Sequence, residues 1–309
     1  MISIVVSVFN EEESLRAFYS ELNSVIPDLD KDYEVIFVDD GSTDGSLKLL
    51  KELSKVDRQV RIYSFRKNQG KAEALTFGFQ KSKGKHVATL DADLQDKPSE
   101  IKSLLKKSEE GWDLVCGWRK NRKDSFFKIL SSKFFNLLAR SFWGLKLHDY
   151  NCGLKLYARE AAISLSLYGG LHRFIPLLVY QQGFTVTEIP VEHEKRKLGK
   201  SKYGFSKLWK DLPDIFTMLF LNKYGKRPLH FFGTIGFIFL LVGFGILTYL
   251  SVGKIFYQQG IGNRPILFLG MLLVLGGFQV LFTGFLADLI INNAHHKKDQ
   301  EFLLKYSSE

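Results

Sequence analysis

The stretch ISIVVSVFNEEESLRAFYSELNSVI, Ile2–Ile26, decides the fold class of this chain. Its first seven residues form a largely β-branched run that is typical of a buried strand, and the polar loop FNEEE follows directly. From Glu12 onward apolar residues recur at helical spacing, which predicts a helix that ends near Ile26. A strand, a polar loop and an amphipathic helix in this order form the repeating unit of an α/β fold with a parallel sheet.

The same alternation of strand and helix continues to Gly117. We predict strands at Ile2–Val8, Tyr33–Val38, Val60–Phe65, His86–Leu90 and Leu114–Gly117, and helices at Glu12–Ile26, Ser46–Lys55, Lys71–Lys81 and Ser99–Glu110. Open parallel sheets bind ligands at the carboxyl ends of their strands. This chain places its polar loops FNEEE, DDGSTDGS, RKNQGKAEA and DADLQD there. We therefore expect a mostly parallel sheet covered by helices on both faces, with the functional site at those loops.

The net charge of +10 is concentrated in one segment. Between Pro190 and Pro228 ten Lys and Arg residues stand against four acidic residues, a net charge of +6. Such a segment indicates an anionic partner, which could be a nucleic acid, a phospholipid surface or a phosphorylated substrate. The two cysteines, Cys116 and Cys152, argue against a disulfide framework and favour a reducing compartment. The N-terminus lacks a basic n-region, so we expect no signal peptide.

Two segments near the C-terminus contain no Asp, Glu, Lys or Arg. Leu229–Leu250 has 22 residues and Pro265–Ala287 has 23, and each is long enough to cross a hydrocarbon core of ~30 Å as a helix. A helical hairpin buried in a soluble core is the alternative. Basic residues are denser outside the two segments than between them, where only Lys254 and Arg264 occur. The positive-inside rule therefore predicts a multi-pass protein of the cytoplasmic membrane, with its N-terminal domain and C-terminal tail in the cytoplasm.

A basic amphipathic segment, Phe205–Leu221, precedes the first apolar segment. Its apolar residues fall at helical spacing, which favours a helix lying in the headgroup plane, although packing on the soluble domain is the alternative. We therefore divide the chain into an α/β domain at 1–202, an interface helix with basic residues at 203–228, and a two-span hairpin at 229–309.

The loop DADLQD raises a question of chemistry. Asp91 and Asp93 are separated by one residue at a strand end, where both carboxylates can turn toward one ligand. Hard divalent cations take oxygen ligands of this kind together with phosphate oxygens and water. Asp39, at the end of an earlier strand, could accept hydrogen bonds from a ribose or a base. The alternative is that carboxylates beside a turn are merely solvated, and the three-residue pattern is weak by itself.

Four segments resemble the successive signatures of family 2 glycosyltransferases with the GT-A fold. They are SIVVSVFNEE, VIFVDDGSTDGS, RKNQGKAEAL and ATLDADLQDKPSEI. Three further segments are similar to motifs of the polyprenyl-phosphate glycosyltransferases, namely GWRK, HDYNCGLKLY and EKRKLGKSKYG. The two predicted spans that follow them also fit this group, which includes the dolichyl-phosphate mannose synthase and undecaprenyl-phosphate glucosyltransferase types. The resemblance covers essentially the whole chain. It departs at Ser7, where the family usually has proline.

The resemblance implies a nucleotide-sugar site whose nucleotide end is lined by Val8, Phe9, Glu11 and Asp39. It implies that Asp91 reaches the ribose or the metal, and that Asp93 and Gln95 hold Mg²⁺ or Mn²⁺ against the donor's diphosphate. Asp96 stands where the family commonly has histidine, and we expect it to be solvated.

The resemblance also implies a basic group that converges on the phosphates, made of Arg119, Arg122, Lys195, Arg196, Ser201 and Lys202. Guanidinium groups match phosphate oxygens in bidentate geometry, and Lys adds a point charge. A solvated face near anionic lipid is the preferred interpretation for Lys197, Lys200, Lys207 and Lys210. Asp149 matches a carboxylate near the acceptor. Because a phosphate acceptor is already ionised near neutral pH, an orienting or structural role is favoured over base catalysis for this residue.

The implied reaction is an inverting, metal-dependent transfer of a hexose from a UDP- or GDP-linked donor to undecaprenyl or dolichyl phosphate at the cytoplasmic face. Asp93, Arg119, Asp149, Arg196 and Lys202 are the residues assigned to catalysis. The expected partners are the donor, the lipid acceptor and membrane lipids, and pairing of copies through the spans stays open. The alternatives are a membrane-anchored scaffold that binds without turnover and a processive polysaccharide synthase. Nucleic acid is not an expected partner, because no base-stacking module accompanies the basic segment.

Overall fold

The structure is a computed structural model that describes residues 1–28, 32–120, 144–194, 220, 224–225, 227–258, 260 and 265–295 of the chain. By its internal contacts the chain divides into two units, Met1–Asp214 and Ile215–Glu309. The predicted amphipathic segment lies outside the described residues except for Phe220.

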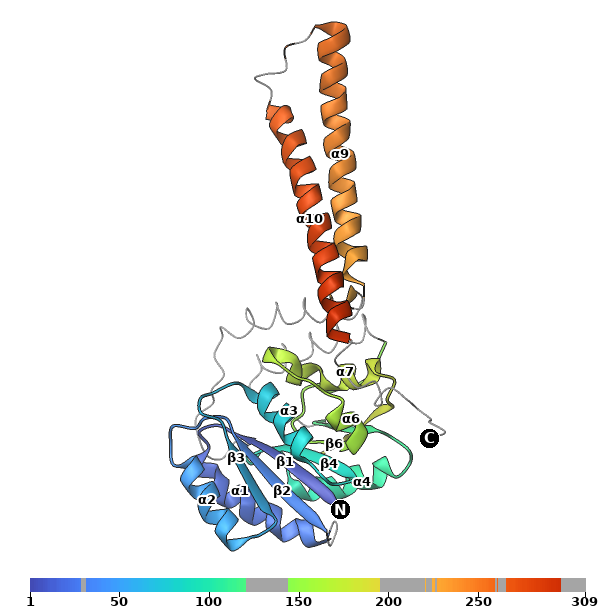
Figure 1. The fold of residues 1–309 in the computed structure, drawn as a ribbon. Coiled ribbons are helices and arrows are strands. Elements are labelled where there is room, and N and C mark those ends of the chain that lie inside the picture. Colours follow the sequence, from blue (N-terminus) through green and yellow to red (C-terminus); the bar gives the residue numbers. More distant parts are fainter. Residues whose placement is uncertain are drawn as a thin grey trace. The chain divides into compact units, whose positions relative to one another are not determined.

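In its described part, the first unit is built on a seven-stranded sheet with the order β3-β2-β1-β4-β6-β5-β7 (Figure 1). The strands are β1 (Ile2–Val8), β2 (Tyr33–Asp39), β3 (Val60–Ser64), β4 (His86–Asp91), β5 (Leu114–Trp118), β6 (Lys155–Ala158) and β7 (Val186–Pro190). Strand β6 runs antiparallel to β4 and β5, and the other neighbouring pairs are parallel. The predicted mostly parallel sheet is confirmed, while β6 and β7 were not predicted.

Helices cover both faces of this sheet (Figure 1). One face carries α1 (Glu12–Val25), α2 (Ser46–Val56) and α4 (Ile101–Ser108), and the other carries α3 (Lys71–Lys81), α6 (Arg159–Ile163) and α7 (Ile175–Gln181). Short 3₁₀ segments occur at η1 (Ile26–Asp28), η2 (Pro98–Glu100) and η3 (Gly169–Phe174). This three-layer arrangement is the α/β class that the alternating pattern predicted.

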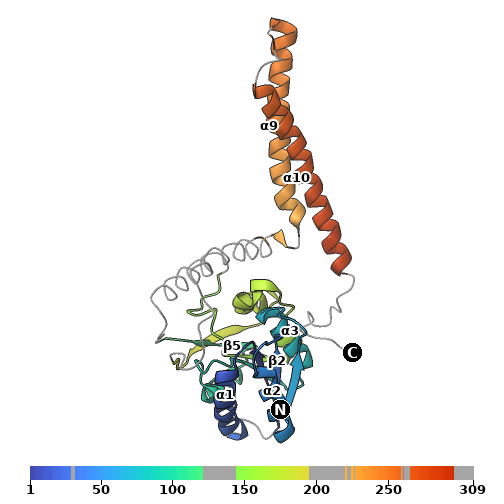
Figure 2. The ribbon, with the colours of Figure 1, turned by 90° about the vertical axis from the view of Figure 1, so that its left-hand side faces the viewer.

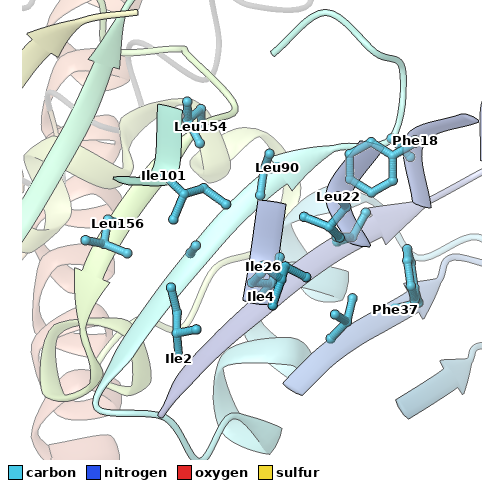
Figure 3. Close-up of a cluster of buried hydrophobic side chains, with 14 of the residues drawn as sticks. Ile2, Ile4, Phe18, Leu22, Ile26, Phe37, Leu90, Ile101, Leu154 and Leu156 are labelled. Carbon is cyan, nitrogen blue, oxygen red and sulfur yellow. The ribbon is translucent and has the colours of Figure 1, made fainter. Parts of the chain in front are cut away.

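The main core lies between the sheet and the helices α1 and α4 (Figure 3). Ile2 and Ile4 of β1 contribute to it together with Phe18 of α1 and Ile101 of α4. Val5, the residue after Ile4 on β1, faces the other side and lies beneath Gly78 of α3, where a Cβ atom would come within 2.3 Å of its Cγ1. Burial on both faces explains why apolar residues occur at neighbouring positions of β1 and not only at alternate ones. Each such side chain contributes roughly 1.5–3 kcal/mol when fully buried, so this packing fixes the strand ends that carry the polar loops.

The second unit contains two long apolar helices, α9 (Pro228–Tyr257) and α10 (Pro265–His295), which run alongside each other (Figure 2). Both are long enough to cross a membrane, since a helix rises about 1.5 Å per residue. Large apolar side chains such as Leu241, Phe244 and Leu272 are exposed on them. A hairpin buried in a soluble core would enclose these side chains, so that alternative does not fit the described helices.

Glycines set the distance between α9 and α10. A Cβ atom on Gly236 would lie 2.8 Å from the carbonyl oxygen of Gly277, and one on Gly277 would lie 2.9 Å from the carbonyl oxygen of Gly236. Gly243 is likewise close to α10, with Val274 Cγ2 at 2.8 Å. Small residues of this kind allow helix backbones to approach closely where lipid provides no hydrophobic drive for association.

Candidate active site

The carboxyl ends of β1, β2 and β4 lie side by side and carry three of the predicted polar loops (Figure 1). In the sheet register Val8 of β1 is opposite Asp39 of β2. Asp91 of β4 is opposite Ser7, the residue before Val8. The fold therefore brings two residues of the predicted nucleotide end and one of the predicted metal ligands to a single edge, as expected for an open α/β sheet.

The loops that follow β1 and β2 are hydrogen-bonded to each other. The N–H of Asn10 donates to Ser42 Oγ at 2.9 Å, and the N–H of Glu11 donates to Ser46 Oγ at 2.9 Å. Asn10 has a φ of 51°, in the left-handed region that residues other than glycine seldom adopt. These bonds hold Phe9 and Glu11, both half-buried, beside the loop after β2.

Two adjacent carboxylates at the end of β2 support the neighbouring loops. Asp39 is fully buried and accepts hydrogen bonds from the N–H of Ser42 at 3.1 Å and from Ser64 Oγ at 2.6 Å. Asp40 accepts the N–H of Gly70 at 3.0 Å. Both oxygens of Asp39 are therefore already bonded to the protein, so any contact of its carboxylate with a nucleotide would be an additional hydrogen bond.

The three predicted metal ligands lie at the last residue of β4 and in the tight turn that follows it. The N–H of Gln95 donates to Asp93 Oδ1 at 3.2 Å, and Gln95 Nε2 donates to the carbonyl oxygen of Glu194 at 3.4 Å. Leu94 between them has a φ of 61°, a strained conformation for a branched residue. Strain of this kind occurs preferentially at functional sites, where the surroundings hold the backbone in place. Asp91, at the start of the turn, is about one-third exposed.

The segment that precedes the basic stretch is attached to this turn. The N–H of Glu194 donates to the carbonyl oxygen of Gln95 at 2.9 Å. Lys97 forms ion pairs with Glu192 at 2.5 Å and with Glu194 at 3.5 Å. The basic stretch that begins at Lys195 therefore follows directly, along the chain, the residues that are held at this turn.

Basic side chains surround Asp91. Lys71 Nζ, from the first residue of α3, lies 2.5 Å from Asp91 Oδ1. Burial alone would raise the pKa of Asp91, but Lys71, with smaller effects of Lys155 and His172, lowers it below its ordinary value. Lys155 is buried and donates to the carbonyl oxygen of Cys152. Burial, with the nearby charge of Lys71, lowers the pKa of His172 to about 3, so that this imidazole is neutral near pH 7.

The expectation that Asp96 is solvated is wrong. Its residue is only 4% exposed, because it forms a β-bridge with His193 and lies close to the loop at Gly153. Burial raises the pKa of Asp96 to about 6, against the lowering effect of Arg119 and with a further increase from Asp91.

A second charged group lies beyond the end of β5. Arg119 donates from Nε to Asp149 Oδ2 at 2.7 Å and from Nη2 to Asp149 Oδ1 at 3.1 Å. Glu188 of β7 in turn accepts the N–H groups of His148 at 2.8 Å and of Asp149 at 3.2 Å. Glu188 therefore positions the backbone of Asp149, and Asp149 positions the guanidinium of Arg119.

Comparison with known proteins bears on what this arrangement does. The sequence profile described as glycosyl transferase family 2 matches residues 3–165. Dodecaprenyl-phosphate galacturonate synthase of Rhizobium johnstonii is 36% identical over 294 residues, which cover 94% of this chain and 87% of that protein. The chain belongs to glycosyl transferase family 2. The family that the four motifs resembled is thereby confirmed, and the protein is an enzyme of the glycosyltransferase class.

Solved structures show the same fold for this family 2 glycosyltransferase. Glucosyl-3-phosphoglycerate synthase from Mycobacterium tuberculosis, in complex with Mn²⁺, uridine diphosphate and phosphoglyceric acid, matches with a TM-score of 0.55 at 18% identity. The match covers 72% of this chain and 78% of that chain. The same enzyme with Mn²⁺ and UDP-glucose matches with a TM-score of 0.53 at 21% identity, over 72% and 78% of the two chains. At these identities the likeness shows the GT-A fold alone.

Of the residues predicted to bind phosphate in this glycosyltransferase, only Arg119 is among the residues that the structure describes. Arg119 is described and lies beside Asp149. The other members of the predicted basic group, Arg122, Lys195, Arg196, Ser201 and Lys202, lie outside the described residues. The same holds for the predicted lipid-facing residues Lys197, Lys200, Lys207 and Lys210.

Three charged residues of the site were not predicted. Lys71 lies within the motif RKNQGKAEAL, where a cation at the first position of a helix is itself an unusual placement. Lys155 lies within the buried run LKLY, and a buried lysine requires a charged or polar partner. Nothing in the local sequence marks Glu188 as a site residue. Strand β7 was not predicted, and the loop of His148 and Asp149, which Glu188 contacts, is far away in the sequence.

The residues of the turn suit a divalent cation. Asp91 and Asp93 supply carboxylate oxygens and Gln95 supplies an amide oxygen, which are the ligands that Mg²⁺ and Mn²⁺ take. No group of three or more His, Cys, Asp or Glu residues in the described part of the chain is arranged to hold a metal by itself. Such a cation would therefore need further ligands from phosphate and water, which is the usual arrangement for Mg²⁺ bound with a nucleotide.

Proposed function

We propose that this glycosyltransferase moves a hexose from a UDP- or GDP-linked donor to a polyprenyl phosphate, with inversion at the anomeric carbon. The observation that carries the proposal is the 36% identity, over 94% of the chain, to a dodecaprenyl-phosphate galacturonate synthase. The oxygen-rich turn at the sheet edge suits a charged donor, and the apolar hairpin suits an acceptor that resides in a membrane.

Asp91, Asp93 and Gln95 would hold Mg²⁺ or Mn²⁺ in this reaction. The bound cation would act as a Lewis acid that offsets the charge developing on the departing diphosphate. The hydrogen bond from the N–H of Gln95 to Asp93 Oδ1 positions the Asp93 carboxylate within the turn. Val8, Phe9, Glu11 and Asp39 would line the nucleotide end, because they follow the adjacent strands β1 and β2.

The acceptor phosphate would meet the predicted basic group. Arg119, held by Asp149, would attract it, and the sequence adds Arg122, Lys195, Arg196, Ser201 and Lys202. An oxygen of the acceptor phosphate forms a bond to the anomeric carbon while the bond from that carbon to the diphosphate breaks, which releases the nucleoside diphosphate. The acceptor oxygen is already ionised, so Asp149 has no proton to remove and serves to orient Arg119.

The membrane placement follows from charge. The segments outside α9 and α10 carry more Lys and Arg than the connection between the two helices. We therefore place the hairpin in the cytoplasmic membrane and the N-terminal unit on its cytoplasmic side. A soluble donor and a lipid acceptor can meet there at one surface.

The test is a donor panel. Membranes that contain the full chain are incubated with undecaprenyl or dolichyl phosphate and with labelled UDP-glucose, UDP-galacturonate, UDP-N-acetylglucosamine or GDP-mannose, and the product is extracted into organic solvent. We expect one donor to label the lipid, EDTA to stop transfer, and Mn²⁺ or Mg²⁺ to restore it. Asp93→Asn should abolish transfer, whereas Glu109→Gln, at an exposed acid after α4, should not. Donor binding without lipid product for any sugar would instead indicate a scaffold.

A further inference from the structure

Lys71 occupies an unfavourable place for a cation. It is the first residue of α3, where the positive end of the helix dipole disfavours a positive charge. Its Nζ lies 2.5 Å from Asp91 Oδ1, and both side chains are about one-third exposed, at 33% and 35%. The carboxylate of Asp91 therefore compensates a charge that the helix end would otherwise reject.

The backbone just before Lys71 is held by Asp40, which follows β2, whereas the partner of the Lys71 side chain, Asp91, belongs to β4. Gly70, immediately before Lys71, has a φ of 111°, which glycine adopts readily and other residues do not. The N–H of Gly70 donates to Asp40 Oδ2 at 3.0 Å, and the N–H of Gln69 donates to Asp40 Oδ1 at 2.7 Å. The end of β2 thus fixes the start of α3, from which the Lys71 side chain reaches Asp91 at the end of β4.

We propose that Lys71 acts as a substitute cation on Asp91, so that the protein binds a divalent cation tightly only together with the diphosphate of a nucleotide. The proposal rests on the proposed function, which places the divalent cation at the turn of Asp91 and Asp93. An ammonium group in contact with Asp91 repels a second cation on the same carboxylate, and this repulsion is strong in a partly buried site. The negative charge of a diphosphate offsets it. Lys71 is thus a positioning residue that couples metal binding to donor binding.

The measurement is Mn²⁺ binding to the full chain in detergent, followed by the loss of the electron paramagnetic resonance signal of free Mn²⁺. Titrations are made with Mn²⁺ alone and with Mn²⁺ plus UDP or GDP. Lys71→Met removes the charge and keeps most of the side-chain length, and Lys71→Arg keeps the charge. Lys81→Met serves as the matched control, because Lys81 is the last residue of the same helix and its replacement changes the net charge equally.

We expect Lys71→Met to bind Mn²⁺ without nucleotide about tenfold or more tightly than wild type, while Lys71→Arg and Lys81→Met remain weak. Nucleotide should tighten Mn²⁺ binding strongly in wild type and by a smaller factor in Lys71→Met, since coupling between two ligands is a difference of free energies. Should Lys71→Met fail to fold, as judged by thermal unfolding, Lys71→Gln provides a second neutral side chain.

Two outcomes overturn the proposal in distinguishable ways. If wild type and the neutral variants bind Mn²⁺ equally without nucleotide, and all bind it with nucleotide, the Lys71–Asp91 pair is only structural and the proposed reaction stands. If no protein binds Mn²⁺ even with UDP or GDP, the metal site of the proposed function is itself wrong, and the role of Lys71 is lost with it.

Discussion

Arg119 donates hydrogen bonds to both oxygens of Asp149, from Nε at 2.7 Å and from Nη2 at 3.1 Å. The two side chains are only 11% and 3% exposed, so water contributes little to either charge. The bidentate pair occupies both carboxylate oxygens of Asp149 with N–H donors of one guanidinium. The geometry therefore favours Asp149 as the residue that orients Arg119.

The first prediction tests this role. Asp149→Asn should lower kcat/KM by about ten- to a hundredfold, because a charge-assisted hydrogen bond contributes about 1.5–3 kcal/mol. The loss should be the same across the pH range in which wild type is active. The measurement is the pH profile of kcat/KM for both proteins. A residual activity that rises steadily with pH, where wild type is flat, would identify Asp149 as a base instead.

The second prediction concerns the buried carboxyl of Asp96. Its pKa of about 6 in the folded protein exceeds the ordinary value of 3.8, so between these two values the folded state binds more protons than the unfolded state. Its contribution to stability is therefore greatest below about pH 4 and is lost as the pH rises through 6. Asp96→Asn keeps a neutral side chain at every pH, and the variant should be more stable than wild type at neutral pH, by up to about 3 kcal/mol.

Thermal unfolding of the full chain in detergent between about pH 4 and pH 8 measures this difference. The stability advantage of Asp96→Asn should shrink as the pH falls and vanish near pH 4. A variant that is less stable than wild type at pH 8 would mean that the ionised carboxylate of Asp96 contributes a favourable contact to Arg119 that outweighs its burial.

The third prediction concerns the close approach of α9 and α10. Gly236→Val should destabilise the hairpin, because its Cβ atom would lie 2.8 Å from the carbonyl oxygen of Gly277. Overpacking of this kind typically costs 1–3 kcal/mol. Gly245→Val is the matched control, since no atom lies within 4 Å of a Cβ at that glycine. The unfolding temperature in detergent should fall for Gly236→Val alone, and equal values for the two variants would contradict the packing.

The fourth prediction separates phosphate binding from attraction to the membrane surface. Arg196→Ala and Lys202→Ala should lose about ten- to a hundredfold in rate with a short soluble acceptor at high salt, because a direct contact with phosphate is lost. Lys207→Ala and Lys210→Ala should be nearly normal under the same conditions. Each headgroup-facing Lys adds only ~1 kcal/mol of membrane affinity, which salt screens. Equal losses in all four variants would make the basic segment a surface patch only.

The first half of the catalytic unit was predicted closely from sequence. Strand β1 and helix α3 have the predicted bounds, Ile2–Val8 and Lys71–Lys81, and the ends of the other early elements differ by two residues or fewer. Their apolar residues repeat with a strand or helix period over several residues, and this period is a local property of the chain. The turn that contains Asp91, Asp93 and Gln95 was found for the same reason, because these residues are neighbours in sequence.

Strands β6 and β7 were not predicted, because each is short and mixes apolar with polar residues. Strand β6 has four residues, of which one is a lysine, and it inserts antiparallel between β4 and β5. Strand β7 has five residues with a half-buried pattern. Neither segment is long enough to show an alternation of apolar and polar residues. Both form strands because they pair with strands that are distant in the sequence.

The sequence by itself determined the fold class, the family and the acidic turn at the end of β4, because each is written in residues that are close together along the chain. The tertiary structure alone decided which charges meet. Lys71 of helix α3 reaches Asp91 of strand β4, Glu188 of β7 holds the backbone of Asp149, and Asp96 is buried where it pairs with His193. The physical reason is that burial and the distance between charges set the energy of an ionised group, and both depend on segments that the fold brings together.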